Sequence, residues 1–378
     1  MKMKIAMFTD SYEPQINGVV TSINNFTSEL RKLGHEVHIF APKDPKYKPK
    51  DRFVHCFDSL QFKPYPEYRI GLTHSFLINS LFNKTDFDVI HVHTPFTLGI
   101  TGLLLAKSKR IPIIGTFHTL ISEYTKYLVK IEKLEKIGKK TAWAFTSWFY
   151  NNCDIIIVPT KEIKRVAIKN GLKKPIKILP TGIRLTRKKY DKRRLKKKYK
   201  LEDKTVLLHV GRVCKEKNID FIIKSMKYVP EGTILIITSD GPAKKELEKM
   251  VNEEALSEKV VFTGYLSNKK LDEIYGLSDI FLMASETDTQ GLVLLEALQH
   301  GLPLVVTKAP VISDFVKKNK VGLVSRRNHK EFADKIIKLS KDKRLYNQLL
   351  KNKDKTLKTY DIKRCTKELL KIYHMATS

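Results

Sequence analysis

The fold is decided by residues 4–41, which read KIAMFTDSYEPQINGVVTSINNFTSELRKLGHEVHIFA. The first five of them, Lys4–Phe8, form a short apolar run that is typical of a buried strand. Apolar residues then recur at helical spacing over Gly18–Leu33, and Gly34 follows as a C-terminal stop. A second apolar run at Val37–Ala41 completes a strand–helix–strand unit, which favours a parallel sheet covered by helices.

The same alternation continues along the chain. In the first half we expect further strands at Asp88–Val92, Pro112–Phe117, Asp154–Val158 and Ile176–Leu179. The pattern then restarts, with strands expected at Thr205–Val210, Thr233–Thr238, Lys259–Thr263, Ile280–Ala284, Leu304–Thr307 and Gly322–Ser325. Helical patterns such as Pro242–Ala255 and Gly291–His300 separate them. The sequence therefore predicts an α/β protein with two Rossmann-like domains.

The boundary between the two domains is expected at Pro180-Thr181-Gly182, where proline and glycine break the periodicity. This gives an N-terminal domain over residues 1–180 and a C-terminal domain over residues 181–360. The helical pattern over residues 361–375 could pack back on the N-terminal domain. A chain of 378 residues suits two domains of ordinary size.

Several classes of protein are disfavoured by the composition. No apolar run reaches the roughly 18 residues that a membrane-spanning helix needs. The chain enters its first strand at Lys4, without the apolar core of a signal peptide, which predicts a cytoplasmic protein. The cysteines lack CxxC spacing, so neither a disulfide framework nor a zinc site is expected. They are Cys56, Cys153, Cys214 and Cys365.

The formal net charge of +31 concerns partners rather than fold. Nucleic acid, an anionic membrane and an anionic small substrate all fit it, and so does a lysine-rich proteome. Against nucleic acid, the chain contains no recognised RNA- or DNA-binding module, and its aromatic residues do not alternate with one basic stripe.

Candidate ligand-binding residues should follow the strands, because open parallel sheets bind ligands beyond their carboxyl ends. Gly18 begins a helix after the first strand, where unpaired N–H groups suit a phosphate, although a plain helix-start glycine would look the same. His118 follows a later strand and could transfer a proton or have a structural role. His91 and His93 lie two residues apart in one strand, so they could line the site or cap the strand edge.

In the second half, Arg212 and Lys217 occupy one loop after the strand Thr205–Val210. Two cations suit a diphosphate, although a chance pair is also possible in so basic a chain. The segment SETDTQGLVLLEA, residues 285–297, contains Asp288 before a helix and Glu296 within it. Carboxylates can accept hydrogen bonds from vicinal hydroxyls. The alternatives are an N-cap for Asp288 and a solvent-facing position for Glu296.

Taken in order, these motifs resemble the retaining nucleotide-sugar glycosyltransferases of GT-B architecture, glycosyltransferase family 4, which carry an E-x7-E motif. The resemblance rests on Asn17-Gly18-Val19, His118, Gly211-Arg212 with Lys217, Asp240-Gly241-Pro242, and Asp288 with Glu296. Other stretches look similar to the branch that glycosylates membrane diacylglycerol, namely Thr9–Val20, Pro66-Glu67-Tyr68-Arg69, His91–Phe96 and Thr287–Leu292. The resemblance implies two domains that face each other across a cleft.

The resemblance also implies roles for individual residues. The catalytic set would be His118 beside the anomeric centre, Asp288 on the sugar, and Arg212 and Lys217 on the diphosphate. The donor-binding set would be Gly18, Arg212, Lys217, Asp240, Tyr265, Leu266, Asp288, Thr289, Gln290, Gly291, Leu292 and Glu296. Tyr265 and Leu266 would contact the base, and Glu296 the ribose.

The implied reaction transfers a hexose, glucose from UDP-glucose, to a lipid hydroxyl. Mannose from GDP-mannose, and a polysaccharide or soluble acceptor, are the alternatives. No metal is expected, because the chain has no DxD pair after a strand and no HExxH motif. No other cofactor is expected, since the nucleotide sugar is a substrate.

The sequence departs from the family pattern at four positions. Asp288 replaces the first glutamate of E-x7-E and bears most on the choice of sugar. Ser239 stands where a glycine is usual, Thr181 where an asparagine is usual, and Arg184 where an aspartate is usual.

A basic amphipathic helix is predicted over Tyr124–Phe149. One side would carry the lysines Lys126, Lys130, Lys133, Lys136 and Lys140. The apolar and aromatic residues would fall mostly on the other side, and they are Tyr127, Ile131, Leu134, Phe145, Trp148 and Phe149. Such a helix suits an anionic bilayer surface, to which the basic stretch Arg187–Lys200 could add attraction. The alternative is an ordinary helix that packs on the sheet. The membrane interpretation predicts a peripheral protein on the cytoplasmic face of the membrane.

Overall fold

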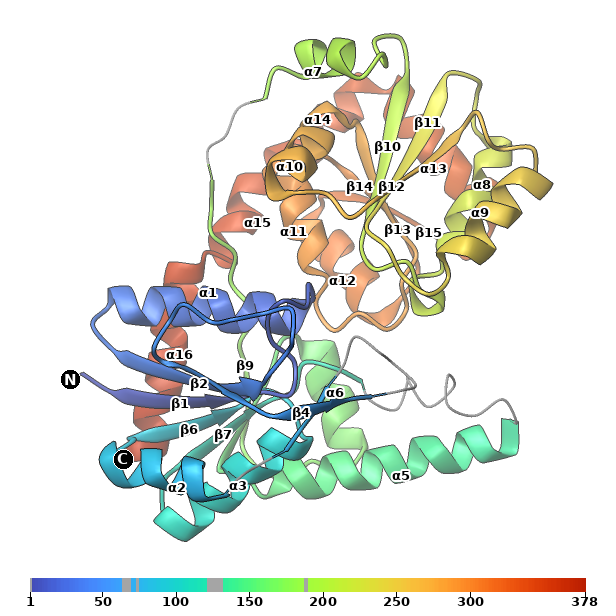
Figure 1. Cartoon of the computed structure of the whole chain (residues 1–378). Coiled ribbons are helices and arrows are strands. Elements are labelled where there is room, and N and C mark those ends of the chain that lie inside the picture. The colour runs from blue at the N-terminus through green and yellow to red at the C-terminus, as the bar shows by residue number, and fades with distance from the viewer. Residues whose placement is uncertain (1, 63–68, 73–74, 121–131, 187–189) are drawn as a thin grey trace. The chain divides into compact units, whose positions relative to one another are not determined.

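The computed structural model describes residues 2–62, 69–72, 75–120, 132–186 and 190–378, and it contains two compact units (Figure 1). The first unit consists of Met1–Arg184 together with Tyr360–Ser378, and the second is Leu185–Thr359. The sequence analysis placed the boundaries of these parts at residues 180 and 360. Both units contain the alternating strands and helices that the sequence predicted.

The first unit is built on a parallel sheet with the strand order β3-β2-β1-β6-β7-β8-β9. Its strands are β1 (Lys4–Phe8), β2 (Glu36–Pro42), β3 (Val54–Phe57), β6 (Val89–Val92), β7 (Ile113–Thr116), β8 (Ile155–Val158) and β9 (Ile176–Ile178). β4 (Ser59–Gln61) and β5 (Arg69–Gly71) form a separate antiparallel pair. Strands β3, β4 and β5 were not predicted, because their sequences VHCF, SLQ and RIG are interrupted by polar residues and form no continuous apolar run.

The helices of this unit are α1 (Gly18–Lys32), α2 (Ser75–Lys84), α3 (Thr97–Lys109), α5 (Glu132–Asn151), α6 (Lys161–Lys169) and α16 (Ile362–Thr377). α1 and α16 lie on one face of the sheet (Figure 1). There Ile23 and Leu30 of α1 share a core with Leu369 of α16 and with Ile5 and Met7 of β1. The last helix of the chain therefore completes the first unit.

The return of the chain to the first unit requires a glycine at position 182. A Cβ on Gly182 would lie 2.6 Å from the Cα atom of Ile362, so any side chain would clash with the start of α16. Next to it, Ile183 and Asp361 form a parallel bridge. Backbone contact thus joins two segments that are far apart in the sequence.

The second unit has a parallel sheet with the strand order β12-β11-β10-β13-β14-β15. Its strands are β10 (Thr205–Val210), β11 (Thr233–Thr238), β12 (Val260–Gly264), β13 (Ile280–Met283), β14 (Leu304–Thr307) and β15 (Gly322–Ser325). Its helices are α7 (Lys192–Lys198), η2 (Lys215–Lys217), α8 (Ile219–Ser225), η3 (Met226–Tyr228), α9 (Lys244–Glu253), α10 (Asn268–Leu277), α11 (Leu292–Gln299), α12 (Pro310–Asn319), α13 (His329–Lys341), α14 (Lys343–Lys351) and α15 (Lys353–Thr359). Leu207, Ile237 and Leu282 of the sheet share a core with Ile222 of α8 and Phe332 of α13.

Each sheet has a position where the direction of winding reverses. β1 is followed in the chain by β2 on one side but lies beside β6 on the other, and β10 lies in the same way between β11 and β13. In open α/β sheets, ligands bind outside the carboxyl ends of the strands at such positions. The residues that follow β1, β6, β10 and β13 are therefore the first place to look for a site.

Candidate active site

Three histidines meet at the carboxyl ends of β6 and β7 in the first unit. His93, the residue after β6, has its Nδ1 atom 3.0 Å from Nε2 of His118, which follows β7. His91 lies 2.7 Å from the hydroxyl of Tyr373 on α16 and 2.6 Å from the hydroxyl of Thr116. The rings of His91 and His93 are 4.1 Å apart. The three histidines thus form a continuous row from α16 to His118.

The row is electrically neutral at physiological pH. Burial lowers the pKa of His91 to about 3 and that of His118 to about 4. Burial also lowers the pKa of His93 well below its ordinary value. Neutral imidazoles both donate and accept hydrogen bonds, so the row can orient His118 and exchange a proton with a ligand. The sequence analysis named His118, whereas the contact with His93 depends on the neighbouring positions of β6 and β7.

Asp10 is a buried residue at this strand end whose role the sequence analysis missed. Its carboxylate accepts hydrogen bonds from the hydroxyls of Thr94 and Thr97 at 2.7 and 2.8 Å, and from the N–H of Leu98 at 2.8 Å. It therefore caps the start of α3 and ties the β1–α1 loop to β6. The threonines before an apolar helix are the only sequence signal for this contact.

Gly18 is the first residue of α1, as predicted. The preceding Asn17 caps the helix, because its Oδ1 atom accepts from the N–H groups of Val19 and Val20, each at 3.0 Å. Two of the N–H groups that the sequence seemed to offer to a phosphate are therefore already bonded.

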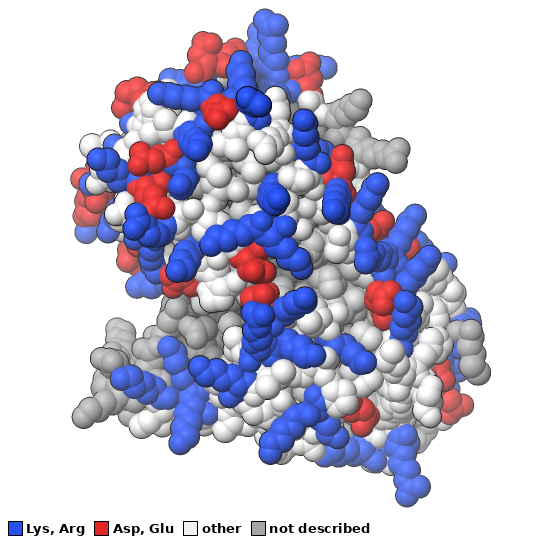
Figure 2. Space-filling model, turned by 180° about the vertical axis from the view of Figure 1, so that it is seen from behind, with Lys and Arg blue, Asp and Glu red and all other residues white. Residues whose placement is uncertain are grey.

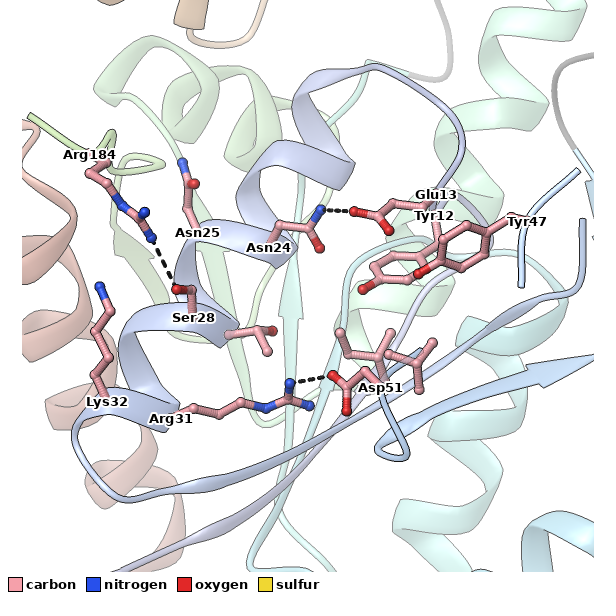
Figure 3. A pocket seen from close by; sticks show the side chains of 13 residues that line it. Tyr12, Glu13, Asn24, Asn25, Ser28, Arg31, Lys32, Tyr47, Asp51 and Arg184 are labelled. Carbon is pink, nitrogen blue, oxygen red and sulfur yellow. Dashed lines mark hydrogen bonds and ion pairs between the residues drawn. The ribbon is translucent and has the colours of Figure 1, made fainter. Parts of the chain in front are cut away.

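A polar pocket of about 920 Å³ lies along α1, within the first unit (Figure 3). Its lining residues are Tyr12, Glu13, Asn24, Asn25, Thr27, Ser28, Arg31, Lys32, Ile39, Tyr47, Asp51, Val54 and Arg184. Arg184, where the family pattern has an aspartate, donates to the hydroxyl of Ser28 at 3.1 Å. Arg31 pairs with Asp51 and Lys32 with Glu29, so much of the charge around the pocket is compensated.

At the corresponding strand ends of the second unit, Lys217 and Asp288 form an ion pair. The Lys217 ammonium lies 2.9 and 2.8 Å from the two carboxylate oxygens of Asp288. The side chains are 21% and 18% exposed. Lys217 ends η2, which follows β10, and Asp288 lies in the loop after β13, so the neighbouring positions of β10 and β13 bring them together.

The ion pair keeps both groups charged. Burial acts to raise the pKa of Asp288, but the Lys217 ammonium outweighs it and the net pKa is lowered. Burial likewise acts to lower the pKa of Lys217, while the carboxylate raises it above its ordinary value. Asp288 is not the N-cap of α11, because Gly291 occupies that position.

Glu296 lies on α11 and is not solvent-facing. Its Oε2 atom accepts from the hydroxyl of Tyr275 at 2.9 Å, and burial raises the pKa of its carboxyl group. The Nδ1 atom of His300 lies 2.8 Å from the carbonyl oxygen of Glu296, and the His300 ring stacks on Tyr275 at 4.7 Å. The carboxylate is therefore held in one position by a packed aromatic pair.

The loop before α11 needs a glycine at position 291. Gly291 has φ +74°, and a Cβ there would lie 2.8 Å from Cδ1 of Ile312. Thr289 and Gln290 precede it, and Leu292 is the first residue of the helix. The backbone thus turns sharply between Asp288 and the helix N-terminus.

The remaining predicted donor-binding residues follow other strands of the same sheet. Arg212 lies two residues after β10, and Asp240 two residues after β11. Asp240 accepts from the N–H of Gly241 at 2.7 Å, and its carboxylate lies 3.5 Å from the Lys244 ammonium. Tyr265, which is exposed, and Leu266 come directly after β12.

The predicted membrane-binding lysines are only partly within the described residues. Lys126 and Lys130 lie outside them, as does the side chain of Lys133, whereas Lys136 and Lys140 are exposed on α5. The expectation that Trp148 and Phe149 share one side of the helix is wrong, because Trp148 is 51% exposed while Phe149 is fully buried. Consecutive helical residues point about 100° apart, so the two rings diverge.

Two features are absent from the part of the chain that the structure describes. Among these residues, no cluster of three or more His, Cys, Asp or Glu side chains could hold a metal ion. No helix there is long and apolar enough to cross a bilayer.

Comparisons with known proteins fit this arrangement. Residues 16–187 match the family described as Glycosyltransferase Family 4, and residues 191–356 match Glycosyl transferases group 1. The alpha-monoglucosyldiacylglycerol synthase of Acholeplasma laidlawii is 32% identical over 378 residues, covering 95% of this chain and 93% of that protein. The chain belongs to glycosyltransferase family 4.

Solved structures show the fold of this family 4 glycosyltransferase. Sucrose-phosphate synthase from Thermosynechococcus elongatus superposes with a TM-score of 0.83 at 19% identity, covering 99% of both chains. Anabaena HepE, solved with UDP and glucose, superposes with a TM-score of 0.80 at 16% identity, covering 99% of this chain and all of that one. The family 4 glycosyltransferase therefore has the GT-B fold, with two Rossmann-like domains.

Proposed function

We propose that this family 4 glycosyltransferase moves glucose from UDP-glucose to a hydroxyl of a membrane lipid such as diacylglycerol, with retention of the anomeric configuration. The observation that carries the proposal is the 32% identity to the Acholeplasma laidlawii alpha-monoglucosyldiacylglycerol synthase over 95% of this chain. The UDP and glucose in the Anabaena structure support the choice of donor. The reaction would take place at the cytoplasmic face of the membrane.

The donor would bind at the strand ends of the second unit. The diphosphate would take Arg212 and Lys217 as counter-ions. Asp288 and the backbone of Thr289–Leu292 would hold the sugar. When the diphosphate draws the Lys217 ammonium toward itself, the Asp288 carboxylate can accept hydrogen bonds from sugar hydroxyls, so both charges stay compensated. Glu296, held by Tyr275, would accept from the ribose hydroxyls.

The chemical step requires stabilisation of the leaving group. As the bond between the anomeric carbon and the phosphate oxygen breaks, negative charge develops on the nucleoside diphosphate. Cations that are fixed in place before the reaction stabilise this charge without reorganisation, so no metal is required. The lipid hydroxyl oxygen would bond to the anomeric carbon on the face that the phosphate leaves, and the hydroxyl proton would pass to the departing phosphate oxygen. His118, oriented by His93, would lie beside that carbon.

Contact with the membrane would involve α5. Ile137 and Trp148 on this helix are 61% and 51% exposed, and Lys136 and Lys140 are exposed near Ile137. Exposed apolar side chains beside lysines suit the interface of an anionic bilayer.

Figure 2 shows Lys and Arg side chains spread over the visible face with Asp and Glu between them, rather than in the single stripe that a nucleic acid would favour.

The proposal is tested by offering the purified protein a panel of UDP- and GDP-sugars together with membrane lipids, and by reading the products with mass spectrometry. We expect a hexosyl-diacylglycerol that forms from UDP-glucose. A mannosylated product from GDP-mannose would move the assignment to the alternative donor. Transfer to soluble acceptors, with no lipid product, would contradict the lipid-acceptor assignment.

A further inference from the structure

His209 lies where the β10–β13 ladder ends. The register of the two strands pairs Leu207 with Ile280 and Leu208 with Phe281, and stops there. Beyond that point, the Nδ1 atom of His209 lies 3.0 Å from the carbonyl oxygen of Leu282. A carbonyl oxygen only accepts hydrogen bonds, so Nδ1 must carry the proton.

The other ring nitrogen of His209 is therefore a bare acceptor. Burial lowers the pKa of His209 to about 4, so the ring is neutral at physiological pH and Nε2 carries a lone pair. The residue is 1% exposed, and Nε2 has no hydrogen-bond partner within the described part of the chain. A buried polar atom without a partner is costly, and in a native protein it calls for an explanation.

The surroundings of Nε2 lie at the predicted donor site. Gly211, two residues on, has φ +149°, which favours glycine. A Cβ on Gly211 would lie 3.8 Å from Nε2 and, apart from the glycine's chain neighbours, within 4 Å of no other described heavy atom. The missing side chain thus leaves space beside the lone pair. Lys217 and Asp288 both act electrostatically on the His209 ring, which places it close to the ion pair.

We propose that His209 determines donor specificity by accepting a hydrogen bond from a hydroxyl of the nucleotide sugar through Nε2. This inference rests on the proposed function, which supplies the class of ligand. The tautomer selects the kind of partner: diphosphate oxygens only accept hydrogen bonds, so a bare Nε2 disfavours them, whereas a sugar hydroxyl can donate. The hydroxyl belongs either to the hexose or to the ribose.

The test compares donor analogues that each lack one hydroxyl, with kcat/KM measured for the wild type and for His209→Phe. Phenylalanine keeps a flat ring but has no acceptor. In the wild type, we expect removal of the partner hydroxyl to lower kcat/KM on the order of tenfold to a hundredfold, the effect of leaving one buried acceptor unpaired. In His209→Phe, kcat/KM for intact UDP-glucose should fall by a similar factor. The analogue that lacks the partner hydroxyl should then be used as well as intact UDP-glucose. A 2′- or 3′-deoxyribose analogue identifies the ribose, and a deoxyhexose analogue the hexose.

A second measurement needs no substitution. The ¹⁵N signal of His209 Nε2 should shift when the wild-type protein binds UDP-glucose. With UDP alone, the signal should shift only if the ribose is the partner. Lys215→Ala changes an exposed residue and is the control variant, which should show the same shift as the wild type. The inference is overturned if the enzyme is active but each deoxy analogue lowers kcat/KM equally in the wild type and in His209→Phe, or if the Nε2 signal does not shift. Either result leaves the proposed function standing. A wild type that uses none of the sugar nucleotides overturns the proposed function instead.

Discussion

The two strand-end regions of this protein share an architecture but differ in charge. In the first unit, buried His93 follows β6 and half-buried His118 follows β7, and both remain neutral. In the second, the loops after β10 and β13 carry the Lys217–Asp288 ion pair. Two parallel sheets of the same kind thus present neutral, hydrogen-bonded imidazoles in one unit and an ion pair in the other. Fold decides where a site lies, and the side chains at the strand ends decide what it binds.

The difference also suggests a division of labour. A diphosphate needs cations that stay charged, and we propose that Lys217 and Arg212 of the second unit have this role. We propose that the neutral histidine row acts at the reacting centre instead.

Acid should destabilise the first unit more than the second. The folded-state pKa values of His91 and His118 are about 3 and about 4, against an ordinary value of 6.5. Below pH 6.5 the unfolded chain binds more protons than the folded one, so stability is present above that pH and is lost as pH falls toward 4. In the second unit, burial lowers the pKa of His209 to about 4, so this histidine also lowers stability as pH falls. The raised pKa values of Asp10 and Glu296 act in the opposite direction, one in each unit.

The expected loss in the first unit is on the order of several kcal/mol between pH 6.5 and pH 4. Hydrogen exchange followed peptide by peptide would measure it, with peptides from β6 and β7 losing protection before those from β10 and β13. Loss of protection in the second unit first would contradict the neutral-row description.

Lys217→Ala should lower turnover at least about a hundredfold, the scale of removing one preorganised group that stabilises the transition state. Arg212→Ala should have an effect of the same order. Lys215→Ala is the matched control, because Lys215 belongs to the same η2 segment and is 67% exposed. Steady-state kinetics would check this, on preparations whose circular dichroism shows that the fold is retained, because Lys217→Ala breaks the Lys217–Asp288 pair and should also lower stability. If the Lys217 and Lys215 variants were equally active, the diphosphate assignment would fail.

Asp288→Ala should destabilise the protein by about 1–3 kcal/mol. Removing one partner of a fully buried ion pair costs about 3–5 kcal/mol, and partial exposure of this pair reduces the penalty. Glu246→Ala is the control, since Glu246 is an exposed residue 3.6 Å from Lys215, and it should change stability by less than about 0.5 kcal/mol. Urea unfolding followed by circular dichroism measures both variants. Equal stabilities would mean that Lys217 does not depend on Asp288.

The membrane contact should respond to charge on α5. Replacing Lys136 and Lys140 with glutamate should weaken binding to anionic vesicles by at least about thirtyfold, because each of the two lost cations contributes about 1 kcal/mol near such a surface. Added salt should weaken wild-type binding as well. Lys245→Glu with Lys249→Glu on α9 makes the same charge change in the second unit and should leave binding intact. Equal losses in the two pairs would point to net charge rather than to α5.

The sequence predicted the strands and helices more fully than the contacts at the site. Apolar runs and glycine breaks located β1, β2 and the strands of the second sheet, because these signals are local. It named Lys217 and Asp288 but not their ion pair, which joins residues 71 positions apart and depends on β10 and β13 being neighbours. For the same reason it missed the hydrogen bond between His93 and His118.

Other misses come from burial rather than from strand order. The helical projection of residues 124–149 grouped Trp148 with Phe149, but tertiary packing decides which ring is covered, and Phe149 lies against Gly99 of α3. The sequence around Glu296 did not indicate its hydrogen bond with Tyr275, because Tyr275 lies on another helix. A carboxylate within an apolar helix could only be marked as unusual.

The contrast between the two strand ends is tested most directly by calorimetric titration of UDP-glucose into the wild type, Lys217→Ala and His118→Ala, with turnover measured on the same preparations. We expect Lys217→Ala to bind the donor much more weakly, while His118→Ala binds it with nearly wild-type affinity and loses turnover. Weak donor binding by His118→Ala together with normal binding by Lys217→Ala would contradict the account, because the neutral row would then hold the donor and the charged loops would not.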